Sequence, residues 1–231
     1  MTKTIVIHQP DFMPYLGFFH RLIHADEFIL LDHVQFVSGT SKSWTHRDKI
    51  KTSSGDAWLS LSVKKAPFGT PINAIRLSDT NDWISANLRQ LCHNYSRAPF
   101  FHQIFPYVED LYASHHDLLV DFNLESIALI MRLLDIRIPV MLSSSMSPQG
   151  SKNSLLIDLL SKRGATHYLS GEGARAYLQT PQFYSAGIQV IWQDFHHPVY
   201  PQLFEGFIPY LSTLDLLFNC GIKQSSDILR H

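Results

Sequence analysis

Two short apolar runs near the amino end of the chain each stop at polar side chains. Residues 4–7 form the first run and residues 28–31 form the second, and a turn containing prolines and a glycine follows the first. Open α/β sheets build ligand sites in this way, because the carboxyl ends of buried parallel strands open into a crevice. The polar side chains expected at this edge are His8, Gln9, Asp11, Asp32 and Gln35.

The composition is that of a folded protein with a substantial core. The chain has 231 residues, of which 45% are hydrophobic and 17% are charged, so disorder is not expected. A net charge of −1 argues against a large basic face for nucleic acid. Cys92 and Cys220 are far apart and form neither a zinc motif nor a disulfide framework.

We expect a cytoplasmic protein without membrane insertion. The apolar run before His8 is too short for a signal peptide. No apolar stretch approaches the roughly 20 residues that a membrane-spanning helix needs.

The order of elements predicts an α/β fold. Strand and helix patterns alternate at both ends of the chain, which favours a Rossmann-like, mostly parallel sheet with helices on both faces. We expect residues 1–231 to form a single α/β domain, with a helical segment of about residues 82–134 inserted between its amino-terminal and carboxyl-terminal parts. Strands are predicted at residues 4–7, 28–31, 58–63, 138–142, 167–169 and 188–192, and helices at 16–25, 83–95, 105–113, 126–134 and 153–163. Residues 38–55 are expected to form a polar loop.

His8 and Asp32 are the candidate catalytic pair. An imidazole beside a carboxylate can act as a general base or acid near neutral pH. The alternative is that His8 bonds the backbone at a strand end. For the group of polar residues at the strand ends, Gln9, Asp11 and Gln35 included, the sequence favours a functional role in substrate binding.

A glycine-containing turn is the candidate phosphate site. Ser170, Gly171 and Gly173 follow a predicted strand and precede a predicted helix. Glycines there allow backbone N–H groups to approach an anion. The alternative is a tight turn without a ligand, because the full dinucleotide fingerprint is missing.

A third candidate lies in the polar loop. Trp44 is either a ligand platform or a residue that packs onto the sheet as a plug, and Arg47 is a candidate clamp for phosphate or carboxylate. The alternative for Arg47, Lys49 and Lys51 is a solvated strand, since their alternation would place them on one face.

Near the carboxyl end, Asp215 and Asn219 are spaced to share one face of an apolar helix. We interpret them as structural polar groups that need partners. No ligand spacing for a metal is present, and the His196–His197 pair has no companion ligands.

Several separated motifs together resemble the WbqC-like protein family. They are HQPDFMPYLGFFHRLIHADEFILLDHVQF, SWTHRDKIKTSSGDAWLSLSVK, GATHYLSGEGARAYL, GIQVIWQDF, HPVYPQLF and FIPYLSTLDLLFNCG. The resemblance covers nearly the whole chain. It implies a bacterial protein of O-antigen and other surface polysaccharide biosynthesis, which transfers an acyl or aminoacyl group to a nucleotide-linked amino sugar.

The resemblance leaves alternatives open. It implies a sugar nucleotide as small-molecule partner, an acyl or aminoacyl thioester as donor, an acyl-carrier protein as a further partner, and no tightly bound cofactor. One alternative is a non-catalytic ligand-binding or assembly protein of a polysaccharide cluster. A second is a nucleotidylyltransferase-like enzyme, although the paired His-x-x-His of such enzymes is missing.

Overall fold

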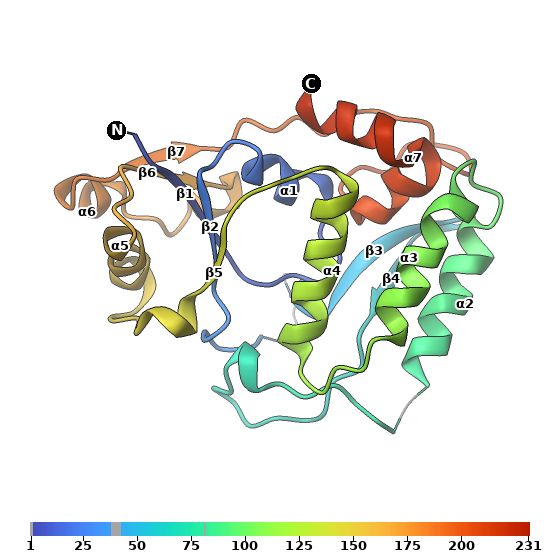
Figure 1. The fold of residues 1–231 in the computed structure, drawn as a ribbon, viewed down its shortest axis with the longest axis horizontal. Helices are drawn as coiled ribbons and strands as arrows, with labels where there is room; N and C mark the ends of the chain where they lie inside the picture. The colour runs from blue at the N-terminus through green and yellow to red at the C-terminus, as the bar shows by residue number, and fades with distance from the viewer. Residues whose placement is uncertain (1, 38–42, 81) are drawn as a thin grey trace. The chain divides into compact units, whose positions relative to one another are not determined.

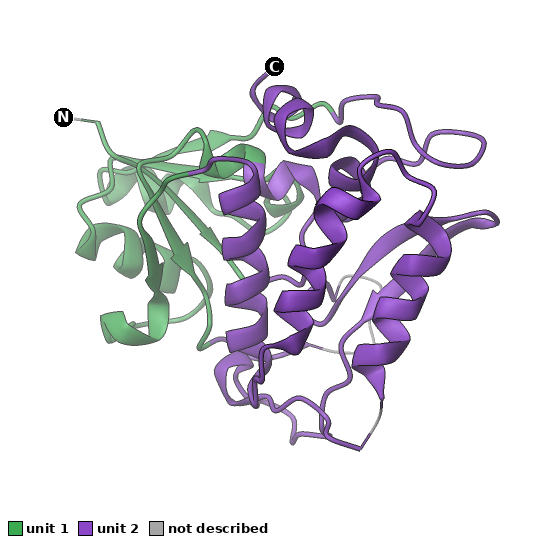
Figure 2. Cartoon of the chain, turned by 45° about the vertical axis from the view of Figure 1, so that its right-hand side comes forward, with its two compact units in different colours: residues 1–9, 20–33, 137–196 green, residues 10–19, 34–136, 197–231 purple. Residues whose placement is uncertain are grey.

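The computed structural model describes residues 2–37, 43–80 and 82–231. Residues 38–42, part of the predicted polar loop, lie outside the described residues. The chain divides into two compact units (Figure 2). Unit 1 comprises residues 1–9, 20–33 and 137–196, and unit 2 comprises residues 10–19, 34–136 and 197–231. The predicted helical segment falls within unit 2, and the single domain stays a prediction.

Unit 1 contains a five-stranded parallel sheet (Figure 1). Its strands are β1 (Thr4–His8), β2 (Glu27–Leu30), β5 (Val140–Leu142), β6 (His167–Ser170) and β7 (Gln189–Trp192). They lie in the order β5-β2-β1-β6-β7, and every neighbouring pair is parallel. The predicted Rossmann-like α/β fold with a mostly parallel sheet is confirmed.

Helices cover both faces of this sheet. The Tyr168 ring of β6 stacks on Phe183 of α6 (Thr180–Ser185), with ring centroids 5.7 Å apart. The next residue, Leu169, lines a cavity together with His20 of α1 (Leu16–Leu22). Because successive strand residues point to opposite faces, α6 and α1 lie on opposite sides of the sheet, as Figure 1 shows. The helix α5 (Lys152–Lys162) is followed by its cap Arg163 and then by Gly164, whose φ of 66° is the left-handed conformation typical of the residue after a helix cap.

The strand order reverses between β1 and β6. From β1 the chain continues to β2 and then to β5 on one side, whereas β6 and β7 are added on the other side of β1. Such a reversal leaves a crevice at the carboxyl ends of the two adjacent strands, which is where open α/β sheets bind ligands. Thr4 pairs with His167 and Ile5 with Tyr168. Continued along both strands, this register brings His8 opposite Gly171.

Unit 2 consists of helices and a β-hairpin. The hairpin pairs β3 (Arg47–Thr52) with β4 (Gly55–Ser60), and η1 (Ile72–Ala74) is a 3₁₀ turn. The helices are α2 (Trp83–Tyr95), α3 (Phe101–Ala113), α4 (Leu119–Leu133) and α7 (Thr213–Arg230). In Figures 1 and 2, α2, α3 and α4 stand side by side. Asp82 caps α2, because its side chain accepts a hydrogen bond from Ser85 N.

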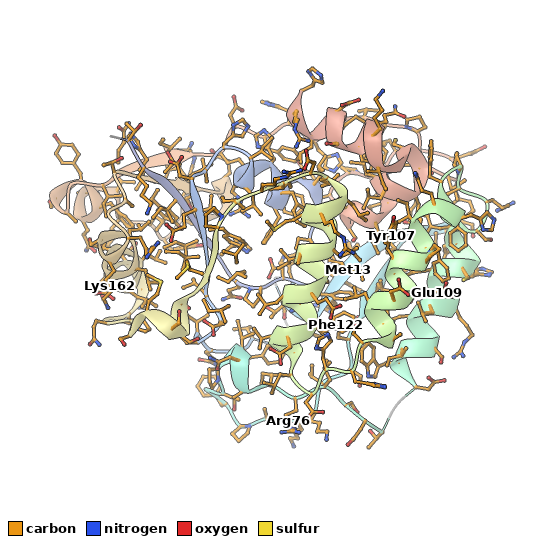
Figure 3. The ribbon with its side chains drawn as sticks, in the orientation of Figure 1. Met13, Arg76, Tyr107, Glu109, Phe122 and Lys162 are labelled. Carbon is orange, nitrogen blue, oxygen red and sulfur yellow. The ribbon has the colours of Figure 1, made fainter. Side chains whose placement is uncertain are left out.

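Aromatic rings form much of the core of unit 2. Phe122 of α4, labelled in Figure 3, contacts the rings of Phe12, Trp83 and Tyr112 at centroid distances of 6.1, 5.8 and 5.2 Å. Such ring contacts stabilise a core beyond the area that they bury. Tyr112 of α3 therefore serves in packing, and it is almost fully buried.

Several predicted boundaries were wrong: α1 ends at Leu22 rather than at residue 25, and β4 spans Gly55–Ser60 rather than residues 58–63. Helix α3 begins at Phe101 rather than at residue 105, because Phe101 and Ile104 are buried at helical spacing. Helix α4 begins at Leu119, before the predicted residue 126, for the same reason. The polar loop includes the strand β3, in which Lys51 is only 1% exposed. Its ammonium group donates to the carbonyl oxygens of Phe204 and Gly206, and these bonds compensate the burial of a charge.

Candidate functional site

The candidate site of unit 1 lies at the reversal of the strand order. His8 is the last residue of β1, and Gln9 follows it. Ser170 is the last residue of β6, and Gly171 follows it. The sequence predicted all four as site residues, and the sheet brings both pairs to the carboxyl ends of adjacent strands. Their roles in catalysis and substrate binding remain predictions.

A buried arginine that the sequence analysis missed belongs to this site. Arg21 of α1 is only 4% exposed. A β-carbon built on Gly171 would lie 3.6 Å from its Nη1 atom and 3.8 Å from Oε1 of Gln193. The guanidinium therefore lies at the end of β6. Arg21 follows Phe18 by three residues and therefore shares the buried face of the helix. A charged residue on an otherwise apolar helix face is the sequence signal that could have revealed Arg21.

His8 is neutral at physiological pH in this setting. Its side chain is half-buried, and its Nδ1 atom lies 3.1 Å from the carbonyl oxygen of Gln9. Burial, and then the positive charge of Arg21, lower the pKa of His8 from 6.5 to about 3. A bound anion would offset the charge of Arg21 and raise this pKa, which would make His8 a stronger base.

Asp32 is tied to the short 3₁₀ helix η2 (Ser143–Met146), which follows β5. Its carboxylate is 2% exposed and accepts hydrogen bonds from Ser143 Oγ at 2.8 Å and from Ser144 N at 2.9 Å. The Ser144 hydroxyl donates to its other oxygen. His33 Nδ1 lies 2.6 Å from the same Ser143 hydroxyl. These contacts give Asp32 a structural role, and its predicted catalytic role beside His8 stays a prediction.

The glycine turn differs from the predicted one. It opens η3 (Glu172–Ala174), a 3₁₀ helix of three residues, and not a regular helix. Gly171 has an extended backbone with a φ of −73°. A β-carbon on Gly173 would have no neighbour within 4 Å. A three-residue turn has too few aligned peptide dipoles to hold an anion at its start, so Arg21 is the better candidate for an anion-binding group here.

The other candidate substrate-binding residues lie in unit 2. Gln35 forms a single antiparallel bridge with Pro71. Burial raises the pKa of the Asp48 carboxyl well above its usual range, and the negative charge of the nearby Asp11 raises it further. Their predicted roles as binding residues are not tested by these contacts.

Arg47 and Trp44 both contact the ring of Trp58 in β4. The Arg47 guanidinium carbon lies 4.1 Å from the Trp58 ring centroid, and the Trp44 ring lies 5.4 Å from it. The Arg47 Nε atom also donates to the Ser43 carbonyl oxygen at 3.3 Å. This stacking is a cation–π interaction. Arg47 would therefore have to bind an anion while its guanidinium remains stacked on the Trp58 ring.

Asp215 is the centre of a buried hydrogen-bond network in unit 2. Its carboxylate accepts hydrogen bonds from Tyr95 Oη at 2.8 Å, Tyr200 Oη at 2.9 Å and Gln202 Nε2 at 2.8 Å. Asn219 donates to the Asp215 carbonyl oxygen at 2.7 Å. These bonds join α7 to α2 and to the segment before α7. They give Asp215 and Asn219 the hydrogen-bond partners that we expected two polar groups on an apolar helix to need.

The described residues contain neither a cluster of metal ligands nor a membrane-spanning helix. No group of three or more His, Cys, Asp and Glu side chains is arranged to hold a metal ion. None of the described helices combines the length and the apolar character needed to cross a bilayer.

Comparison with known proteins identifies the family. The model of the WbqC-like protein family matches residues 9–227. The chain is 34% identical, over 232 residues, to the uncharacterized protein Rv1507c of Mycobacterium tuberculosis (strain ATCC 25618 / H37Rv), and the match covers 99% of this chain and 98% of that relative. No solved structure matches the chain. The chain belongs to the WbqC-like protein family.

Proposed function

We propose that this protein is an enzyme of bacterial surface polysaccharide biosynthesis that transfers an acyl or aminoacyl group to the amine of a nucleotide-linked sugar. The observation that carries the proposal is the buried guanidinium of Arg21 beside Gly171, where the strand order reverses. A cation with little exposure, at the carboxyl ends of parallel strands, is suited to bind a phosphate group. Family membership supports the polysaccharide context.

The chemistry would need one base and one anion site. The sugar amine attacks the carbonyl carbon of a thioester, a C–N bond forms, and the C–S bond breaks with the sulfur leaving as a thiolate. His8 takes the proton that the nitrogen loses and returns it to the thiolate. Arg21 binds the phosphate of the sugar nucleotide, and this negative charge raises the pKa of the neighbouring His8 toward the range in which a base is effective.

The test is a turnover assay with a matched pair of arginine variants. Purified protein is incubated with nucleotide-linked amino sugars and acyl thioesters, and product is detected by mass spectrometry. Arg21→Gln is expected to lower kcat/KM by about 10- to 100-fold, the loss of one charge-assisted contact to phosphate. Arg89→Gln, which alters an exposed arginine of α2 outside the candidate site, is the control and should keep the wild-type turnover. Arg21→Gln turnover equal to that of the wild type contradicts the proposal.

A second function is favoured by one observation. The pKa of His8, about 3 in the free protein, is far below the range of an effective general base. A protein that only binds a sugar nucleotide would have no need of such a base. A rise in melting temperature with sugar nucleotides, an Arg21-dependent response and no turnover across the panel would favour the binding protein over the enzyme.

A further inference from the structure

Unit 1 has a cavity beside the Arg21 site. Its volume is about 400 Å³. The strands β6 and β7 provide one wall with the side chains of Leu169 and Ile191, which share one face of the sheet, and α1 provides the facing imidazoles of His20 and His24. The ring of Trp192 points to the other face, where the Arg175 guanidinium stacks on it at 4.5 Å. The cavity thus has an apolar wall and a polar wall, and the Asp194 carboxylate also lines it.

Gln193 connects this cavity to the anion site. It lines the cavity, and its Nε2 atom lies 3.2 Å from His20 Nδ1. Its Oε1 atom and the Arg21 guanidinium both lie within 4 Å of the position of a β-carbon on Gly171. Gln193 therefore borders both the cavity and the Arg21 guanidinium, so one ligand could contact both.

The polar wall is suited to an uncharged group. The Nε2 atoms of His20 and His24 lie 3.3 Å apart, so one ring donates a proton to the other and the pair does not carry two charges. Burial, and then the nearby His24, lower the pKa of His20. The cavity thus offers two imidazoles and the Asp194 carboxylate opposite aliphatic side chains. The carboxylate can accept hydrogen bonds from hydroxyl groups and repels an anion, so this setting fits a planar heterocycle or a pentose better than a second phosphate.

We infer that this cavity receives the nucleoside of the nucleotide-linked sugar, with the phosphate extending past Gln193 to Arg21. The inference rests on the proposed function and specifies which part of the substrate each region of unit 1 holds. Ligand pockets usually span about 300–1,000 Å³. The volume of about 400 Å³ has room for one nucleoside and not for a whole sugar nucleotide, so the sugar would lie on the other side of Arg21, near His8.

The test compares two substitutions at exposed positions of the same sheet. Ile191 of β7 lines the cavity, whereas Val140 of β5 lies on the opposite edge strand, and both are exposed. Ile191→Trp and Val140→Trp are titrated by calorimetry with inorganic phosphate and with a panel of nucleoside monophosphates (UMP, dTMP, CMP, GMP and AMP). Melting temperatures establish that both variants fold.

The expected result is selective for the nucleoside. At least one nucleoside monophosphate binds the wild type about tenfold or more tightly than inorganic phosphate, and Ile191→Trp removes that advantage. Val140→Trp keeps the advantage, and neither variant changes the affinity for inorganic phosphate by more than about twofold.

Two results overturn the inference and leave the anion site in place. One is a nucleotide affinity that Ile191→Trp leaves unchanged. The other is an Ile191→Trp variant that loses binding of an acyl N-acetylcysteamine thioester but not of nucleotides, which would make the cavity an acyl pocket. A different result would contradict the proposed function itself. In that case Arg21→Gln would bind inorganic phosphate with the same affinity as the wild type.

Discussion

The guanidinium of Arg21 lies 3.6 Å from the point where a β-carbon on Gly171 would be. We expect an anion that binds Arg21 to pass through the space beside Gly171. Because Gly171 has an extended backbone with a φ of −73°, alanine can adopt its conformation without strain. We expect Gly171→Ala to leave the melting temperature within about 2 °C of the wild type and to weaken phosphate binding by about fivefold or more, measured by calorimetry.

Gly173→Ala is the matched control for this prediction. A β-carbon there would meet nothing within 4 Å, so this variant should bind phosphate as the wild type does. Equal phosphate affinity for Gly171→Ala and the wild type would place the anion away from Gly171.

The low pKa of His8 predicts a dependence of stability on pH. The folded protein takes up the His8 proton near pH 3, whereas the unfolded chain takes it up near pH 6.5. As the pH falls from 6.5 toward 3, the unfolded state binds more protons, so the free energy of unfolding decreases. We expect His8→Asn to lose less stability than the wild type between pH 6.5 and pH 4.5, by up to about 1.4 kcal/mol per pH unit.

Urea denaturation at several pH values measures this difference. Other histidines titrate in both proteins, so the difference between the two curves isolates His8. Parallel curves for the wild type and His8→Asn would mean that His8 is accessible to protons in the folded state.

Asp32 provides a prediction that separates structure from catalysis. Its carboxylate accepts from both Ser143 and Ser144, and an amide would direct N–H donors at one of them. We expect Asp32→Asn to lower the free energy of unfolding by about 1–3 kcal/mol, because a buried acceptor is lost. Unchanged stability with a loss of turnover would instead support Asp32 as the catalytic partner of His8.

The sequence was sufficient for the sheet of unit 1 because each strand has a local signature. Residues 4–7 and 28–31 are apolar runs bounded by polar turns, and such runs are typical of buried parallel strands. It was insufficient for β3, where Asp48 and Lys51 are buried in a segment that composition marks as a loop. Their burial depends on partners far along the chain, such as the Gly206 carbonyl that accepts from Lys51, and local patterns do not contain that information.

The candidate site could be predicted only in part, for a related reason. His8, Gln9, Ser170 and Gly171 were found because strand ends are visible in the sequence. Arg21 was missed, because its proximity to Gly171 arises from the pairing of β1 with β6, which are far apart in the sequence. The side-chain spacing of α1 shows that Arg21 faces inward, but only the strand order shows what it faces.

Gly221 provides the last prediction. It lies inside α7 with a φ of 72° and a ψ of 175°, which divides the helix. Its β-carbon position is 2.5–2.8 Å from carbon atoms of the Phe100 ring. Because that backbone conformation is essentially restricted to glycine, and because the added methyl would clash with the ring, we expect Gly221→Ala to destabilise the protein by about 3 kcal/mol or more in urea denaturation.

Gly164→Ala separates backbone strain from the clash. Gly164 also has a positive φ, 66°, but a β-carbon there would meet nothing within 4 Å, so its substitution should cost only about 1 kcal/mol. In the double variant Gly221→Ala/Phe100→Ala the clash is gone, and the cost of the alanine, measured against Phe100→Ala alone, should fall toward the strain component. If Gly221→Ala costs no more than Gly164→Ala, the Phe100 ring moves aside freely and does not fix the break in α7.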